Sequence, residues 1–79
     1  MNIAAQVKNL VAVHFDLDPS LISEKASFVD DLGADSLAIT ELTLALEEEF
    51  EIEIDDEEMG GVETVGDAIA YVGTRSVAD

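Results

Sequence analysis

The sequence predicts an all-α fold, a small helical bundle of three main helices plus one short helix, with a long first loop. Apolar residues recur at the three- and four-residue spacing of amphipathic helices in three separate segments. The one alternating segment, Ile52 to Ile54 among acids, has no second such segment with which to pair as a strand. A chain of 79 residues, 48% of them hydrophobic, is expected to form one folded domain over residues 1–79.

A first amphipathic helix is expected from about Ile3 to Phe15. Its apolar positions share one broad face at helical spacing: Ile3, Val7, Leu10, Val11 and Phe15. Residues 16–35 follow as a long loop, which needs its own anchors in a compact domain. Asp18 before Pro19 is typical of a cap and a first helical position, so one short turn is expected there. Five apolar side chains are predicted to pin the loop to the bundle: Leu21, Ile22, Phe28, Val29 and Leu32.

A second helix is expected from about Ser36 to Glu51. At about 100° per residue, one stripe should face the core: Ile39, Leu42, Leu46 and Phe50. The opposite face mixes leucines with acids: Leu37, Glu41, Leu44, Glu48 and Glu51, with Glu47 at its edge. An ordinary solvated face is one interpretation. Two aligned leucines rimmed by carboxylates instead favour a surface on which a partner docks.

The segment from Asp55 to Met59 is expected to form one brief helical turn, which Gly60-Gly61 would end. The last main helix is predicted to begin at Thr64, an N-cap followed three residues later by Asp67 near the positive end of the helix dipole. Its apolar stripe consists of Val65, Ala68, Ile69 and Val72. Gly73 is the predicted C-terminal stop.

Composition excludes several classes of function. The chain has 19 acidic and 3 basic residues, a net charge of −16, so it has almost nothing with which to neutralise phosphates. Nucleic acid is therefore excluded as a partner and anionic membranes are disfavoured, which leaves basic protein surfaces and divalent cations. Self-repulsion of this charge predicts that stability rises with salt or magnesium. There is no cysteine, no signal peptide and no apolar stretch able to span a bilayer, so a cytoplasmic protein is expected.

Ser36, in Asp35-Ser36-Leu37, stands out as the candidate functional residue. A nucleophilic serine needs an adjacent general base, but the one histidine, His14, lies on another predicted helix, and there is no G-x-S-x-G elbow. Capping of the helix by Asp35 or Ser36 is the purely structural interpretation. A helix N-terminus also stabilises an attached phosphodiester through its free N–H groups and its dipole. Asp35 adds an opposing negative charge, so it makes more sense as a residue read by a modifying enzyme.

The longer string around this serine resembles the acyl carrier proteins of dissociated (type II) fatty-acid synthesis. The matching residues are Leu32-Gly33-Ala34-Asp35-Ser36-Leu37, followed by Glu41-Leu42 and by Leu46-Glu47-Glu48-Glu49-Phe50. The similarity runs from Phe28 to about Tyr71 and includes Thr64-Val65-Gly66-Asp67-Ala68.

The resemblance implies a non-catalytic, monomeric carrier. In that family the serine matching Ser36 holds 4′-phosphopantetheine, attached from coenzyme A by a phosphopantetheinyl transferase, and acyl chains ride on its thiol as thioesters. The implied docking residues for basic patches of the transferase and synthase enzymes are Asp35, Leu37, Glu41, Leu44, Glu47 and Glu48. The implied lining of the acyl pocket is Leu42, Leu46, Val62 and Ile69. No specific metal site is implied.

Three positions depart from the family pattern, and alternatives stay open. Thr40 stands where valine is usual, Gly60-Gly61 replaces charged helix formers, and Phe15-Asp16 lacks the usual glycine. The glycines leave room for a specialised polyketide or long-chain acyl pathway, and an aminoacyl or peptidyl carrier is the nearest rival. An unmodified acidic interaction domain is the alternative from another class. A calcium sensor is disfavoured, because the sequence contains no D-x-D-x-D-G loop.

Overall fold

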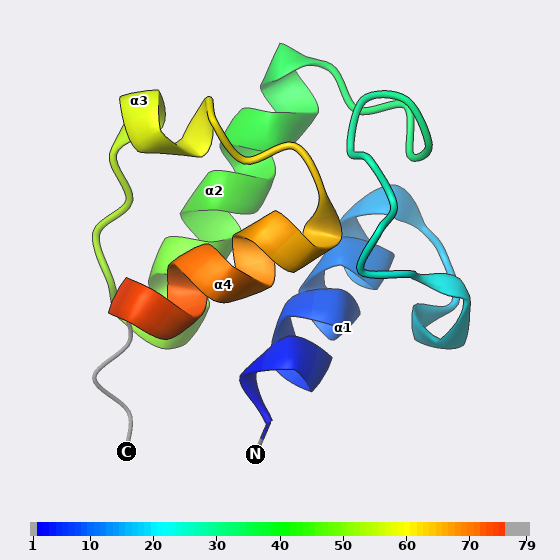
Figure 1. Ribbon diagram of the computed structural model, residues 1–79, viewed down its shortest axis with the longest axis horizontal. Coiled ribbons are helices and arrows are strands. Elements are labelled where there is room, and N and C mark those ends of the chain that lie inside the picture. The colour runs from blue at the N-terminus through cyan, green and yellow to red at the C-terminus, as the bar shows by residue number, and fades with distance from the viewer. Residues whose placement is uncertain (1, 76–79) are drawn as a thin grey trace.

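The computed structural model describes residues 2–75, apart from the side chain of Asp56. It contains helix α1 (Ile3–Phe15), the 3₁₀ turn η1 (Pro19–Leu21), α2 (Ser36–Phe50), the short α3 (Asp56–Met59) and α4 (Val65–Arg75). Figure 1 shows α4 crossing in front of α2, with α1 alongside both. Helix α1 packs against both α4 and α2. The predicted all-α architecture of three main helices and one short helix is confirmed.

Side-chain caps set where the helices begin. The Asn2 side chain accepts the N–H groups of Ala4 and Ala5, at 2.7 and 3.3 Å. Thr64 Oγ1 accepts the N–H of Asp67 at 3.1 Å, and the Asp67 carboxylate accepts the N–H of Thr64 at 3.2 Å, a reciprocal capping box. Asp18 caps η1 by accepting the N–H of Ser20 at 2.9 Å. The predicted starts at Asp18 and Thr64 are therefore confirmed.

The predicted end of the last helix at Gly73 is wrong. Helix α4 continues through Gly73 to Arg75. A stop would have required a left-handed backbone at this glycine, whereas the one glycine with positive φ among residues 2–75 is Gly33. The two residues beyond Gly73 are held by a tertiary contact, because Arg75 binds Glu58 of α3. That interaction outweighs the tendency of Gly73 to end the helix.

The ends of α1 and α2 carry non-glycine residues in the left-handed region. Asp16 caps α1 with φ 56° and ψ 49°, and Glu51 caps α2 with φ 54° and ψ 49°. Asp16 thus adopts the left-handed conformation that glycine most often adopts at helix ends. For a residue with a Cβ atom this conformation costs some backbone energy. Although this chain lacks the glycine that the family usually has at the end of the first helix, Asp16 still takes the left-handed backbone conformation there.

The core combines one face of each main helix with two anchors from the first loop. The largest fully buried side chains are Phe28, Leu42, Leu46, Val7, Val11, Val65 and Val72. Ile22 and Phe28 are buried as predicted, and Leu32 packs partly against them. The predicted anchoring by Leu21 and Val29 is wrong, since they are 77% and 64% exposed. Each directly adjoins a buried anchor, and neighbouring side chains in these turns point in different directions.

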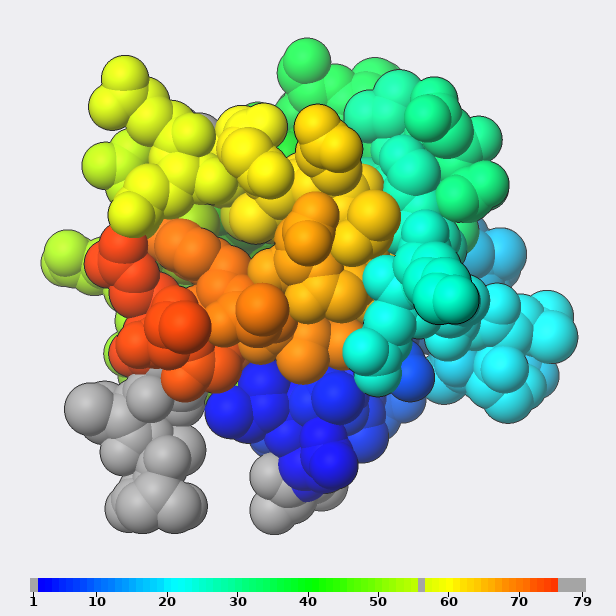
Figure 2. All heavy atoms as spheres, viewed as in Figure 1, coloured from blue at the N-terminus to red at the C-terminus, as the bar shows by residue number. Residues whose placement is uncertain are grey.

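The first loop is also tied to the connection before α4 through backbone hydrogen bonds. The N–H of Phe28 donates to Glu63 O at 3.0 Å, that of Val65 to Ala26 O at 3.0 Å, and that of Gly66 to Glu24 O at 2.8 Å. Ser27 and Thr64 form an isolated antiparallel bridge within this contact. In Figure 2 the loop segment lies against the first turn of α4. We call these paired segments, residues 24–28 and 63–66, the loop clasp.

Gly66 is needed where the loop clasp meets α4. A Cβ atom at this position would lie 2.9 Å from the backbone oxygen of Glu24. That separation is closer than carbon and oxygen tolerate, and a backbone oxygen within a hydrogen-bonded clasp cannot move aside cheaply. Glycine at position 66 therefore permits the close approach. None of the helices found in residues 2–75 combines the length and apolar character that crossing a membrane requires.

Candidate functional site

Ser36 is the first residue of α2, and its side chain is exposed. The capping role belongs to Asp35, whose Oδ1 accepts the N–H of Ala38 at 2.8 Å. The Asp35 carbonyl accepts the N–H of Ile39 at 3.0 Å and so begins the helical ladder. Between the two capping interpretations, the structure selects Asp35. The Ser36 hydroxyl is left available at the helix N-terminus.

The residues before Ser36 set the direction in which α2 leaves the loop. Gly33 has φ 70°, a left-handed conformation that favours glycine. Ala34 is buried, and its N–H donates to Phe28 O at 2.7 Å. The Asp31 carboxylate accepts the N–H of Ser27 at 2.7 Å and closes the turn between them. The string before the serine therefore has a structural task, which is to present the start of α2 at the surface.

A pocket of about 930 Å³ opens beside Ser36. Its wall includes apolar side chains from four segments of the chain, among them Phe28, Val29, Ile39, Met59 and Val62. Polar residues of α2 also line it, namely Ser36, Thr40 and Thr43. Ser27 and the carboxylates of Asp30, Asp35 and Glu63 complete the polar part of the wall. A group attached to the Ser36 hydroxyl thus has a recess with both apolar and polar walls within immediate reach.

The sequence and the structure overlap only partly on the lining of this pocket. Val62 lies in the pocket wall. Leu42 and Leu46 are fully buried in the core, and Ile69 packs partly against that core outside the pocket wall. Sequence reasoning did not single out Phe28, Met59 or Thr43 as lining residues. Thr43 could have been found, because it lies seven residues after Ser36 and so shares its side of the helix.

The outer face of α2 is exposed as the helical wheel predicts. Leu37 is 65% exposed and Leu44 is 55% exposed. Glu41, Glu48 and Asp35 are exposed as well. We call this surface, made of Asp35, Leu37, Glu41, Leu44 and Glu48, the outer face of α2. Val29 is exposed too and lies in the pocket wall, so the loop adds an apolar side chain close to Ser36.

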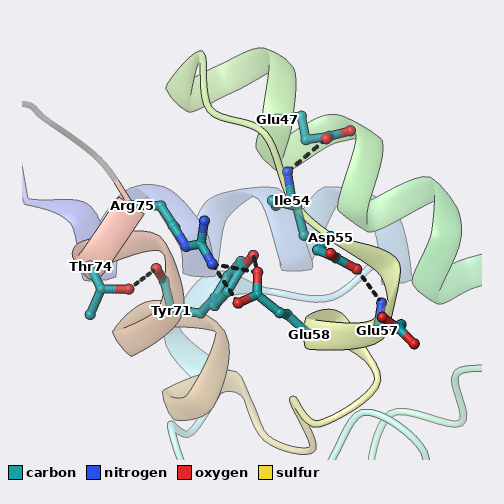
Figure 3. A network of polar contacts seen from close by, with 8 residues as sticks. All are labelled: Glu47, Ile54, Asp55, Glu57, Glu58, Tyr71, Thr74 and Arg75. Carbon is teal, nitrogen blue, oxygen red and sulfur yellow. Dashed lines mark hydrogen bonds and ion pairs between the residues drawn. The ribbon is translucent and has the colours of Figure 1, made fainter.

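Glu47 behaves differently from the other acids of α2. Its side chain is half-buried, and Oε2 accepts the N–H of Ile54 at 2.8 Å (Figure 3). The carbonyl of Glu47 also accepts the N–H groups of Glu51 and Ile52. Glu47 therefore ties the end of α2 to the connection that leads into α3.

A second cluster of polar side chains joins α3 to the last turns of α4 (Figure 3). Glu58 pairs with Arg75 and accepts the Tyr71 hydroxyl at 2.8 Å. The Arg75 guanidinium lies 5.2 Å from the centre of the Tyr71 ring. Partial burial, followed by donation to the Glu58 carboxylate, raises the pKa of Tyr71 above its ordinary value. We call these three residues the α3–α4 cluster.

The basic residues of the chain are few, and two of them are engaged in ion pairs. Arg75 binds Glu58, and Lys8 of α1 lies 3.5 Å from Glu24 in the loop clasp. The lowered pKa of Asp18 has a local cause, since that carboxylate accepts the backbone N–H and then the hydroxyl of Ser20. Asp18 and Tyr71, the two residues with shifted pKa values, both lie outside the wall of the pocket beside Ser36. The acids of the outer face of α2 are thus available to cations supplied by a partner.

No catalytic arrangement surrounds Ser36 within residues 2–75. No group of these residues hydrogen-bonds its hydroxyl. His14 sits exposed in the last turn of α1, where a partial positive charge is favourable. Across the described part of the chain, no three His, Cys, Asp or Glu side chains gather as metal ligands do. What the site does present is an exposed hydroxyl, a helix N-terminus and an adjoining pocket.

Comparison with known proteins gives a consistent result. Residues 5–72 match the protein family described as phosphopantetheine attachment site. The chain is 49% identical over 74 residues to the acyl carrier protein of Phenylobacterium zucineum, covering 94% of each chain. It is 51% identical over 71 residues to the acyl carrier protein of Caulobacter vibrioides, covering 90% of this chain and 91% of that one. A solved structure of the Enterococcus faecalis acyl carrier protein superposes with a TM-score of 0.79 at 36% identity, covering 94% of both chains.

Proposed function

The chain belongs to the family of acyl carrier proteins, and from that premise we propose that Ser36 is the residue to which its phosphopantetheine arm is attached. The observation that carries this assignment is the exposed hydroxyl of Ser36 at the N-terminus of α2, beside a pocket of about 930 Å³. Asp35 performs the capping, so the Ser36 hydroxyl is not required for the helix.

The protein carries acyl chains in fatty-acid synthesis on a covalent 4′-phosphopantetheine arm. It is a carrier and not a catalyst. The arm supplies a thiol, which this cysteine-free chain lacks, and acyl groups are held on that thiol as thioesters. The chain's own residues position the arm, shelter what it holds and bind the enzymes that act on it.

The residues present fit such a group. A phosphodiester at Ser36 would lie at the N-terminus of α2, where the N–H groups of the first turn and the helix dipole favour an anion. The Asp35 carboxylate already neutralises part of that field by accepting the N–H of Ala38. Ser36 lines the same pocket as the apolar side chains of Phe28, Ile39 and Val62.

The outer face of α2 is the proposed docking surface for the transferase and for acyl-processing enzymes with basic patches. Its exposed leucines supply apolar contact, and its acids attract the partner over longer distances. Glu47 belongs to this surface only in part, because its carboxylate also holds Ile54. The strongest electrostatic contribution is therefore expected from Glu41 and Glu48.

Such a surface suits a carrier that must leave each enzyme quickly. An electrostatically assisted association rate of about 10⁸ M⁻¹s⁻¹ and a Kd of about 10 μM give release at about 10³ s⁻¹. Typical enzyme turnover is about 10 s⁻¹. Docking therefore need not limit the flux of acyl chains.

Intact-mass measurement tests the assignment of Ser36. Incubation with coenzyme A and a phosphopantetheinyl transferase should add one phosphopantetheine, and Ser36→Ala should abolish the addition. Ser20→Ala is the matched control, because Ser20 is also an exposed serine in a helical turn and should leave the addition intact. Addition that persists in Ser36→Ala would refute the assignment of Ser36. Absence of addition in the unaltered protein would also refute it and would favour an unmodified acidic interaction domain.

A further inference from the structure

Thr43 is the one buried polar side chain among those that the structure describes, with 5% of its surface exposed, and it lines the pocket beside Ser36. Valine has nearly the same shape and would bury no polar atom at this position. Burying a hydroxyl is unfavourable unless it forms hydrogen bonds. The other polar residues of the pocket wall, Ser27, Asp30, Asp35, Ser36, Thr40 and Glu63, are exposed or partly exposed, so Thr43 is the one buried polar side chain of the wall. A buried hydroxyl there is placed to bind a polar group of whatever occupies the pocket.

Thr43 is aligned with the attachment site. Ser36, Thr40 and Thr43 lie at positions i, i+4 and i+7 of α2, so they share one side of the helix. At about 1.5 Å of rise per residue, Thr43 lies about 10 Å beyond Ser36 along the helix axis. A group attached at Ser36 that enters the pocket along α2 passes Thr40 and then reaches Thr43.

The hydrogen bond that Thr43 makes defines what it can still bind. Its hydroxyl donates to Ile39 O at 2.8 Å, and the Thr40 hydroxyl donates likewise to Ser36 O at 2.9 Å. Because a carbonyl oxygen cannot donate, the hydroxyl hydrogen is used in each case and only the oxygen lone pairs remain. Thr40 is exposed, so water can serve its lone pairs. Thr43 is buried, and no donor within residues 2–75 pairs with its oxygen.

We propose that the Thr43 hydroxyl is a binding residue of the pocket, which accepts a hydrogen bond from a donor group on the cargo of Ser36. The donor belongs either to an amide N–H of the phosphopantetheine arm or to a hydroxyl on an acyl chain near its thioester. Both are hydrogen-bond donors set in a mainly apolar chain, and Thr43 Oγ1 is a buried acceptor in the same wall as the apolar side chains of Ile39, Met59 and Val62. This inference rests on the proposed attachment at Ser36.

The test compares the gain in melting temperature on loading for the unaltered protein and for Thr43→Val. Three loaded forms separate the sources of the donor: the phosphopantetheine form, a saturated hexanoyl form and a 3-hydroxyhexanoyl form. One ordinary hydrogen bond corresponds to about 5 °C in a domain of this size. We therefore expect Thr43→Val to lose about 5 °C of the gain. Subtracting the unloaded form of each variant removes any effect on folding itself.

Two further variants sharpen the result. Thr43→Ser keeps the hydroxyl and should keep the full gain on loading. Thr74→Val is the matched control, because the Thr74 hydroxyl also donates to a helix carbonyl, Tyr71 O at 2.8 Å, but lies on α4 outside the pocket wall. It should leave the gain unchanged.

Each outcome is decisive. A loss already seen in the phosphopantetheine form assigns the donor to the arm, and a loss confined to the 3-hydroxyhexanoyl form assigns it to the acyl chain. Equal or larger gains in Thr43→Val for all three forms would overturn the inference. Intact mass separates this failure from failure of the proposed function, since a protein that loads at Ser36 but ignores Thr43 refutes only the role of Thr43.

Discussion

Two regions of the molecule use their carboxylates in opposite ways. On the outer face of α2, Glu41 and Glu48 are exposed beside two uncovered leucines. Two carboxylates near α3 are engaged within the chain instead: Glu58 binds Arg75 and Tyr71, and Glu47, from the end of α2, accepts the N–H of Ile54. In a chain of net charge −16, the few available donors are placed where they hold the fold together. The unengaged acids are left for partners.

The loop clasp extends the engaged region, and Gly66→Ala should break it. The new Cβ would lie 2.9 Å from Glu24 O, and such overpacking costs about 1–3 kcal/mol of unfolding free energy. Gly73→Ala is the matched control, because it also lies in α4 but its Cβ meets nothing within 4 Å. That change should stabilise the protein by about 0.5–1 kcal/mol. Thermal unfolding that ranks the two variants in the reverse order would contradict the role of the clasp.

The outer face of α2 should respond in binding and hardly in stability. Glu41→Lys reverses one exposed charge, and we expect about a tenfold slower association with a phosphopantetheinyl transferase at low salt. Stopped-flow association over a range of salt concentrations measures this, and the difference from the unaltered protein should shrink as salt rises. Glu53→Lys serves as the matched control, because Glu53 is also an exposed acid but lies outside the outer face of α2 and outside the wall of the pocket beside Ser36. Unchanged rates and salt dependence in Glu41→Lys would disprove the docking surface.

The α3–α4 cluster should lose stability when its carboxylate is neutralised. Glu58→Gln removes an ion pair whose side chains are 44% and 42% exposed, so we expect a loss of only about 0.5 kcal/mol after solvent screening. Glu48→Gln, which neutralises an exposed acid, should be neutral or stabilising because it reduces repulsion. Urea unfolding compares the two. Equal losses would abolish the distinction between the two regions.

The same cluster can be observed directly through the single tyrosine of the chain. Its pKa is raised in the folded protein, so the folded state holds the phenol proton above about pH 10 while the unfolded chain releases it. Tyr71 therefore favours folding below its ordinary pKa, and this contribution is lost as pH rises through the raised pKa. Ultraviolet absorbance of tyrosinate should show a higher midpoint in buffer than in urea. Coincident midpoints would refute the contact.

The smallest and most diffuse effect is that of bulk screening on the unengaged acids. Added salt or magnesium should raise the melting temperature, because it weakens the self-repulsion of a chain with net charge −16. The rise should be smaller in Glu48→Gln, which has lost one of the repelling charges. A melting temperature that stays flat from low salt to about half-molar salt would contradict this expectation.

The sequence by itself determined the features that depend on neighbours a few residues apart. Helical spacing located α1, α2 and α4, and capping residues located the starts of α2 and α4, since these interactions involve positions i, i+3 and i+4. The exposed leucines of α2 also followed from the wheel. The brief α3 was predicted separately, as a turn from Asp55 to Met59 that Gly60-Gly61 would end. The choice of Ser36 came from local chemistry, and the identity of its arm came from family membership.

Only the tertiary structure decided the features that join distant segments. The loop clasp pairs Ser27 with Thr64, Glu58 holds α4 beyond Gly73, and Glu47 is diverted to Ile54. The pocket beside Ser36 is likewise assembled from several segments, which is why Leu42 and Leu46 lie in the core while Thr43 lines the pocket. Such contacts depend on the path of the chain through space, and the local spacing of residues carries no record of that path.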